Sequence, residues 1–228
     1  MRSLLTPVYV LAAVLLCLAP LGVSLPPLAS LQPTIAELLN QGRVPNLVST
    51  VILHTRLYDT ISEVVVFTLA SIGVRWIFSG EPQQRRVLAL DDAPSVVLCQ
   101  LGATMCALVA VELALRGHLS PGGGFAAGVA GGTAIGLLLI SGSARLTDRL
   151  YQRYRADLWE KAAVVAFLLV AWLSLEGVFP GGAAGSGGRF GAIASGGWIP
   201  LLNVLVALKV TLGSWAMVQL LVRYRGLF

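Results

Sequence analysis

Ionisable side chains inside long apolar stretches are the residues of this sequence that are best suited to chemistry. Lys209 lies nine residues into an apolar segment that begins at Pro200. A charge at the centre of a bilayer costs about 2.5–3.5 kcal/mol on insertion scales. Desolvation lowers a lysine pKa and a nearby carboxylate raises it, so a lysine held between these effects can load and release a proton. The alternative is a permanent pair with an acid on a neighbouring helix, such as Glu112.

Two carboxylates at the start of another apolar segment form a second candidate site. Asp59 and Glu63 are four residues apart, so they share one face of a helix, and His54 and Arg56 precede them. One interpretation is a relay for protons or cations. The other is a polar helix start, in which an acid in the first turn favours the helix dipole. Glu63 lies one turn deeper than capping requires, so both interpretations stay open.

A third candidate precedes a glycine-rich segment. Glu112 lies four residues before Arg116, a spacing that favours a salt bridge along a helix. That pair is either a structural anchor near a membrane interface or a site where Glu112 exchanges a proton with help from His118. Histidine is the side chain whose unperturbed pKa lies nearest neutrality.

Composition places these residues in a membrane protein. Of the 228 residues, 56% are hydrophobic and 12% are charged, whereas soluble domains carry about 25% charged residues. Because a span needs roughly 20 mostly apolar residues, we expect an all-α integral membrane protein with about six transmembrane helices. The predicted spans are 4–21, 60–77, 96–115, 125–140, 162–175 and 200–222.

The basic residues predict the orientation. With a cytoplasmic N-terminus, eleven Lys and Arg residues lie on the cytoplasmic side and four on the other, as the positive-inside rule favours. Both termini are then cytoplasmic in a multi-pass protein of the cell inner (plasma) membrane. The first block has a competing interpretation as a cleaved signal peptide, because Arg2 precedes an apolar run that ends at Ala19-Pro20.

Two further patterns predict how the helices are arranged. A stripe of glycines every fourth residue predicts close helix packing; its members are Gly124, Gly128, Gly132 and Gly136. Residues 143–161 carry an apolar residue every fourth position, which predicts one amphipathic helix at the membrane interface. These apolar positions are Leu146, Leu150, Tyr154 and Leu158.

The sequence contains no pattern of a soluble enzyme. It has no P-loop, dinucleotide-binding fingerprint, metal-ligand spacing or catalytic triad. We therefore expect no enzymatic activity, no cofactor and no metal site. Nucleic acid is not expected as a partner, because the basic residues follow membrane topology.

The sequence resembles the MrpB family, the B subunit of Mrp multi-subunit sodium/proton antiporters. The resemblance rests on two stretches, Arg116-Gly-His-Leu-Ser-Pro-Gly-Gly-Gly-Phe125 and Ile199-Pro-Leu-Leu-Asn-Val-Leu-Val-Ala-Leu-Lys-Val210. Tyr58-Asp-Thr-Ile-Ser-Glu63 is similar to the C-terminal end of MrpA, with Ser62 where that family usually has glycine. The implied organisation is an MrpA-tail part (1–80), a polar linker (81–93) and an MrpB-like part (94–228).

The resemblance implies a small subunit that works beside larger antiporter subunits in a hetero-oligomeric membrane complex. Its implied role is a contribution to sodium or proton translocation, with Na⁺, H⁺ and the lipid bilayer as partners. Asp59, Glu63, Glu112, His118 and Lys209 are its ion-pathway candidates. The alternative is a structural or coupling subunit of a complex-I-like or hydrogenase-linked pump.

Overall fold

The computed structural model describes residues 14, 18, 28–82, 89–176 and 189–225, and their regular structure is entirely helical. Five helical segments within these residues are long and apolar enough to cross a membrane. The prediction of an all-α membrane protein is therefore confirmed. The predicted span 4–21 lies outside the described residues, apart from Val14 and Leu18.

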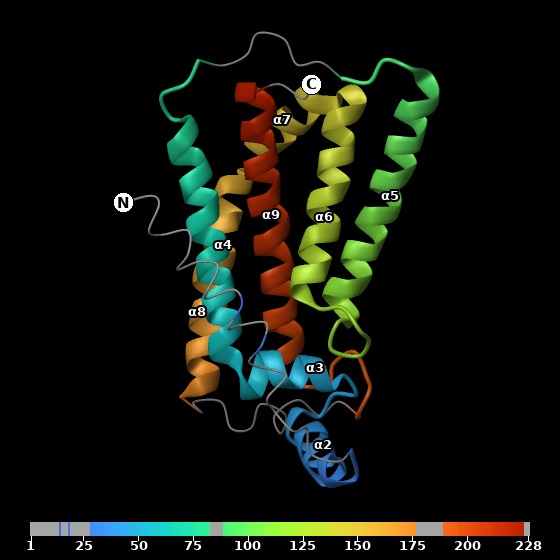
Figure 1. Ribbon diagram of the computed structural model, residues 1–228, viewed down its shortest axis with the longest axis vertical. Helices are drawn as coiled ribbons and strands as arrows, with labels where there is room; N and C mark the ends of the chain where they lie inside the picture. Colours follow the sequence, from blue (N-terminus) through green and yellow to red (C-terminus); the bar gives the residue numbers. More distant parts are fainter. Residues whose placement is uncertain (1–13, 15–17, 19–27, 83–88, 177–188, 226–228) are drawn as a thin grey trace. The chain divides into compact units, whose positions relative to one another are not determined.

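The described chain forms two compact units, Met1–Glu37 and Leu38–Phe228, and every element after α2 belongs to the second. The predicted division at residues 81–93 stays a prediction. The elements are α2 (Leu28–Gly42), α3 (Leu47–Thr50), the π-helix η2 (Val51–Thr55), α4 (Leu57–Phe78), α5 (Ala93–Arg116), α6 (Gly124–Leu138), the π-helix η3 (Leu139–Ser143), α7 (Ala144–Arg153), α8 (Ala156–Leu175) and α9 (Ile199–Arg225) (Figure 1).

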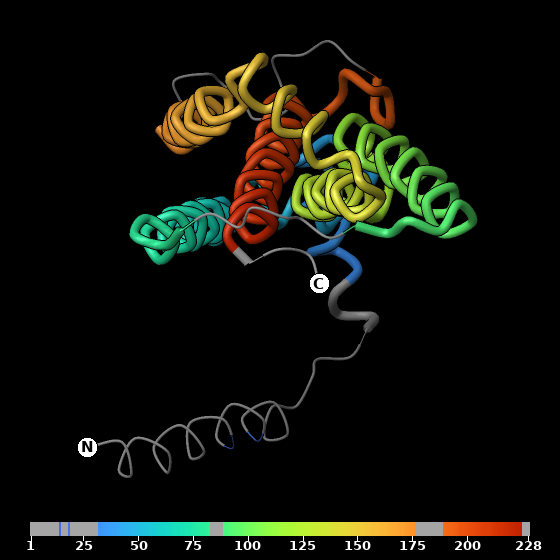
Figure 2. Tube along the Cα trace, turned by 90° about the horizontal axis from the view of Figure 1, so that it is seen from above, coloured from blue at the N-terminus to red at the C-terminus, as the bar shows by residue number. Residues whose placement is uncertain are grey.

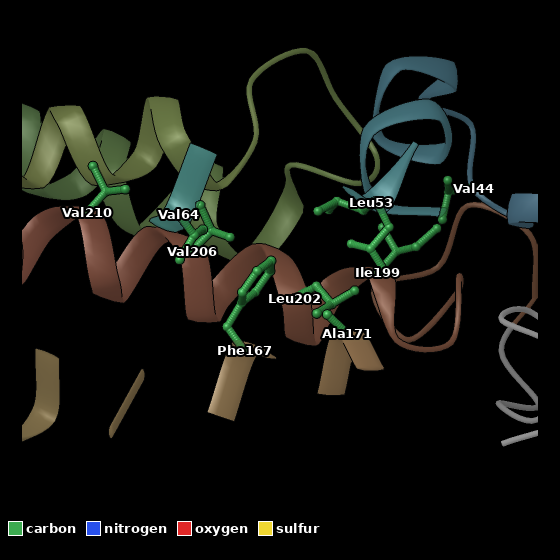
Figure 3. Packing of buried hydrophobic residues seen from close by; sticks show 10 residues of the cluster. Val44, Leu53, Val64, Phe167, Ala171, Ile199, Leu202, Val206 and Val210 are labelled. Atoms are coloured by element: carbon green, nitrogen blue, oxygen red, sulfur yellow. The ribbon is translucent and has the colours of Figure 1, made fainter. Parts of the chain in front are cut away.

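Helix α9 is the centre of the second unit. It packs against α4, α5, α6 and α8, and it lies among them in the view along the bundle (Figure 2). Figure 3 shows Phe167 of α8 and Val64 of α4 beside Leu202 and Val206 of α9, and all four are buried. Because lipid tails are as apolar as these side chains, such van der Waals packing is what holds the helices together in a bilayer.

Helix α6 approaches α9 closely because glycines line the contact. An added Cβ atom would lie 2.5 Å from the nearest α9 atom at Gly124, 2.3 Å at Gly128 and 2.6 Å at Gly132. Gly131 is outside the predicted stripe, and an added Cβ at this position would also lie 2.5 Å from an α9 atom. Gly136 has no described atom within 4 Å of an added Cβ, so it takes no part in this contact, contrary to the prediction.

The predicted amphipathic helix over 143–161 is two helices, so that prediction was wrong. Helix α7 ends at Arg153, and α8 begins at Ala156 after Arg155 adopts a left-handed conformation with φ of 49°. Leu158 therefore belongs to α8, a membrane-spanning helix. At its other end α7 follows a kink at Gly142, where φ is 84°. In the view along the bundle, α7 runs across the end of the bundle and connects α6 with α8 (Figure 2).

Two matched substitutions test the α6–α9 contact. We expect Gly128→Ala to lower the thermal unfolding temperature of the purified protein, because overpacking costs about 1–3 kcal/mol. Gly136→Ala adds the same methyl group to the same helix where no described atom is near, so it should leave the unfolding temperature almost unchanged. Equal effects of the two substitutions would contradict the packing described here.

Candidate functional site

Lys209 lies completely buried within α9. Its ammonium nitrogen lies 5.2 Å from the centre of the Phe67 ring of α4, a cation–π distance. Gly213, one turn further along α9, leaves space for this group: an added Cβ would lie 3.1 Å from Lys209 Nζ and 2.7 Å from Phe67 Cε1. Lys209 therefore supplies the buried ammonium group, and Gly213 supplies the space that this group occupies.

The partner of Lys209 is Glu160 of α8. Lys209 Nζ lies 2.5 Å from Glu160 Oε1, and the exposed fractions of the two side chains are 0% and 6%. Glu112, the partner suggested by the sequence, instead forms an exposed salt bridge with Arg116 at 2.9 Å. The open alternative of a pair with an acid on a neighbouring helix therefore holds with Glu160 in place of Glu112, and the spacing of Glu112 and Arg116 predicted their salt bridge correctly.

Glu160 connects the buried lysine to further charges on α4 and α8. Its Oε2 atom lies 3.0 Å from Nη2 of Arg75, and Ser71 donates a hydrogen bond of 3.3 Å to Oε1. Arg75 also pairs with Asp157, whose other oxygen lies 2.7 Å from Lys161 Nζ. These ion pairs form a continuous chain from buried Lys209 to Lys161, whose side chain is 66% exposed. We call this set of five residues the charge chain: Lys209, Glu160, Arg75, Asp157 and Lys161.

Two cavities border the charge chain. One of about 400 Å³ lies between α4, α8 and α9, and its walls include Lys209, Glu160, Arg75 and Lys161. Another, of about 190 Å³, is lined by Arg75 and Asp157 together with residues of α7 and α9. Arg75 lines both cavities, so the middle of the charge chain borders open space on two sides.

The candidate carboxylates on α4 lie apart from this buried pair. Asp59 pairs with Arg56 at 2.6 Å, and 52% of its side chain is exposed. Glu63 is exposed one turn later and forms no ion pair with a described residue. Both residues are on the outward-facing side of α4, whereas Val64 and Ser71 of the same helix are buried.

His118 is completely buried in the turn between α5 and α6. Neither ring nitrogen makes a hydrogen bond of normal geometry to a described residue, although the backbone of Ile193 and Ala192 lies close enough to interact with the ring. Burial lowers the pKa of His118, and this effect exceeds the opposing influence of the Ile193 and Ala192 backbone. This shift favours the neutral form of the imidazole.

The turn that carries His118 is held from two sides. Asn203 of α9 donates hydrogen bonds of 3.1 Å to the carbonyl oxygen of Leu113 and 2.7 Å to that of Ala114. Ser49 of α3 donates to the Gly117 carbonyl at 2.8 Å. These bonds satisfy carbonyl groups at the end of α5, which lack partners within their own helix. The most distinctive sequence motif thus packs at the bundle end opposite α7 (Figure 1).

A family comparison identifies the larger part of the chain. Residues 94–216 match the model of a family described as a domain related to the MnhB subunit of Na⁺/H⁺ antiporters. The chain belongs to this family. It is a multi-pass membrane protein and a subunit of a Na⁺/H⁺ antiporter-type complex, as the resemblance to MrpB predicted. The match includes the His118 turn, Glu160 and Lys209, but Arg75 precedes it.

The fold of this MnhB-related chain also occurs in a solved structure. The protein is similar to a chain in the structure titled membrane-bound sulfane sulfur reductase (MBS), an archaeal respiratory membrane complex. The TM-score is 0.71 at 20% sequence identity, and the similarity covers 97% of each chain. This likeness shows the fold. No curated protein matches the sequence.

Glu160 and Arg75 are the residues that the sequence reasoning missed. Arg75 was considered only among the basic residues of the cytoplasmic side, and Glu160 only as part of the segment 143–161. The signal for Glu160 was the shortness of the predicted span 162–175, which had to extend into flanking residues. Because α8 begins at Ala156, Glu160 lies one turn inside the helix and reaches α9. Among the described residues, no three His, Cys, Asp or Glu side chains group as a metal site.

Removing one partner of the buried pair should destabilise the protein strongly. Glu160→Gln leaves the Lys209 ammonium without its carboxylate, which costs about 3–5 kcal/mol for a buried pair. Adding Lys209→Met to Glu160→Gln removes the stranded charge, so the double variant should recover much of the lost stability. Glu112→Gln breaks an exposed pair and should cost about 0–1 kcal/mol. Thermal unfolding of the purified complex measures all three.

The buried imidazole predicts a dependence of stability on pH. Its pKa is lowered in the folded protein, so the unfolded chain binds a proton first as the pH falls. The stability contributed by neutral His118 is complete above the ordinary histidine pKa of 6.5 and is lost as the pH falls towards the lower folded-state value. His118→Gln should flatten the change in unfolding temperature between about pH 7.5 and 5.5, a range around the histidine pKa. An unchanged slope would contradict this prediction.

Proposed function

We propose that Lys209 is the proton-exchanging group through which this subunit contributes to cation/proton exchange, with Glu160 as its counter-charge. The observation that carries the proposal is the buried pair within a membrane span, at 2.5 Å and beside a cavity of about 400 Å³. Burial favours the neutral amine and the carboxylate favours the ammonium ion. A lysine between these opposing effects is suited to gaining and losing a proton.

The second oxygen of Glu160 makes proton release from Lys209 less costly. Arg75 contacts this oxygen at 3.0 Å and also pairs with Asp157. Arginine stays protonated under all physiological conditions, so Glu160 keeps one cationic partner when Lys209 becomes neutral. The arrangement therefore supports a change of charge at Lys209 that does not leave an unpaired buried carboxylate.

Asp59 and Glu63 support a separate role at the surface of α4. Their carboxylates are exposed in the described chain, and an ionised group facing lipid is costly. We infer that other subunits of the complex cover this surface, where the two carboxylates would attract a cation on its way through the assembly. Glu112 and His118 remain pathway candidates with weaker support, because Glu112 is exposed and His118 makes no hydrogen bond of normal geometry to a described residue.

A structural or coupling role in a redox-linked pump is the alternative function. Its support is the similarity of fold to a chain of a respiratory membrane complex. In that role the charge chain would join α4, α8 and α9 without moving an ion. Identification of the subunits that co-purify in mild detergent separates these functions: antiporter-like subunits alone favour exchange, and iron–sulfur subunits favour the redox-linked complex.

A charge-preserving substitution tests proton exchange directly. Lys209→Arg keeps a cation for Glu160 but removes a group that can become neutral. We expect assembly of the complex and a fall in sodium-dependent proton movement of about 100-fold or more, typical of lost proton-transfer groups. The measurement is proton flux in membrane vesicles that contain the whole complex.

Lys161→Met is the matched control, because it removes an exposed ammonium from the same charge chain. It should retain most of the flux. Normal flux in both Lys209→Arg and Lys209→Met would overturn the proposal and leave the structural role. If the complex assembles with Lys209→Met but not with Lys209→Arg, arginine does not fit the space beside Gly213. The Lys209→Met complex, which also lacks a group that can bind a proton at this position, then tests the proposal, and normal flux in it would overturn the proposal.

A further inference from the structure

We propose that one face of α7 binds the headgroup of an anionic phospholipid. This face, which we call the α7 basic face, consists of Arg145, Arg149 and Arg153 with the neighbouring Leu146 and Leu150. The arginines are four residues apart, so they lie in one row along the helix. The proposal concerns anchoring to lipid and does not depend on Lys209 exchanging a proton.

The three arginines form an uncompensated positive charge. Each is exposed, and none forms an ion pair with a described residue. Asp148, the only acidic residue of α7, is already engaged by Arg223 and Gln219 of α9. Arg149 Nε donates to the Arg145 carbonyl oxygen at 3.3 Å, which leaves the rest of its guanidinium available.

Exposed apolar and aromatic side chains occur on α7, at its C-terminal end and in the first turn of α8. The exposed fractions are 51% for Leu146, 62% for Tyr154, 52% for Leu158 and 59% for Trp159. Tyrosine and tryptophan are enriched at membrane–water interfaces, where their rings sit at headgroup level. The α7 basic face therefore has the two chemistries of a phospholipid, a phosphate-binding row and a neighbouring apolar edge.

The fold holds this face across the end of the bundle. The kink at Gly142 and the left-handed Arg155 direct α7 away from the axes of its neighbouring helices. The Tyr151 ring packs edge-on against Trp215 of α9 at 5.2 Å, on the other side of α7 from the basic row. Helix α7 is thus fixed to the protein through one side, and its arginines are exposed on the other. Figure 2 shows the helix running across the end of the bundle.

An anionic phospholipid fits these observations better than a soluble phosphate. Basic residues next to a membrane gain about 1 kcal/mol each from anionic lipid, which is roughly a fivefold change in affinity. A soluble phosphate would leave Leu146 and the aromatic edge in water. Guanidinium groups also match phosphate oxygens geometrically, because their N–H donors form a planar fork.

Native mass spectrometry of the delipidated whole complex tests this site. Phosphatidylglycerol is titrated into wild-type complex and into Arg145→Gln/Arg149→Gln. We expect the double variant to bind the lipid about 25-fold more weakly, at fivefold for each arginine. Phosphatidylcholine should bind both proteins equally, and glycerol phosphate should not compete with the lipid.

The control variant is Arg43→Gln/Arg189→Gln, which removes two exposed arginines away from α7 and should keep wild-type affinity. Equal weakening in both double variants would overturn the proposal, as would unchanged affinity in Arg145→Gln/Arg149→Gln. Full competition by glycerol phosphate would indicate a free-phosphate site instead. Loss of a protein subunit from Arg145→Gln/Arg149→Gln would indicate that the face binds a protein.

Discussion

The ammonium group of Lys209 lies inside a membrane-spanning bundle and needs a carboxylate at the same depth, which Glu160 supplies from α8. This requirement fixes much of the surrounding structure. Helix α8 must start early enough to place Glu160 beside α9, and α4 must present Arg75 and Ser71 to the remaining lone pairs. Because an unpaired buried charge is strongly destabilising, these three helices are tied to one relative position.

The other side of α9 obeys a different constraint. Its contact with α6 depends on the absence of side chains at Gly124, Gly128 and Gly132, where even a Cβ would collide. Close backbone approach supplies van der Waals packing that lipid cannot replace. Helix α9 therefore joins a glycine-lined contact on one side to a polar, cavity-lined contact on the other. Gly213 serves the polar side, since an added Cβ would lie 3.2 Å from Glu160 Oε1.

The sequence predicted the fold class and the family, and it singled out Lys209 as a charge within a span, because apolar length, motif spacing and a charge within a span are local properties. It did not predict the partner of Lys209, because pairing depends on where α8 begins. Helix α8 begins directly after Arg155, which adopts a left-handed conformation. The sequence does not reveal this conformation, because residue 155 is not a glycine. The glycine period was similarly sufficient for the α6–α9 contact but could not show that Gly136 lies beyond it.

The identity of the buried cation bears on whether the pair moves a proton or only joins helices. A purely structural ion pair has little advantage, because well-packed apolar residues often stabilise a buried site equally well or better. Arginine would also be a more permanent cation than lysine. A lysine that borders a cavity, opposite a glutamate whose other oxygen is already held by Arg75, is the arrangement that the proposed proton exchange requires. An arginine or an apolar residue at this position would fit a purely structural role better than the lysine does.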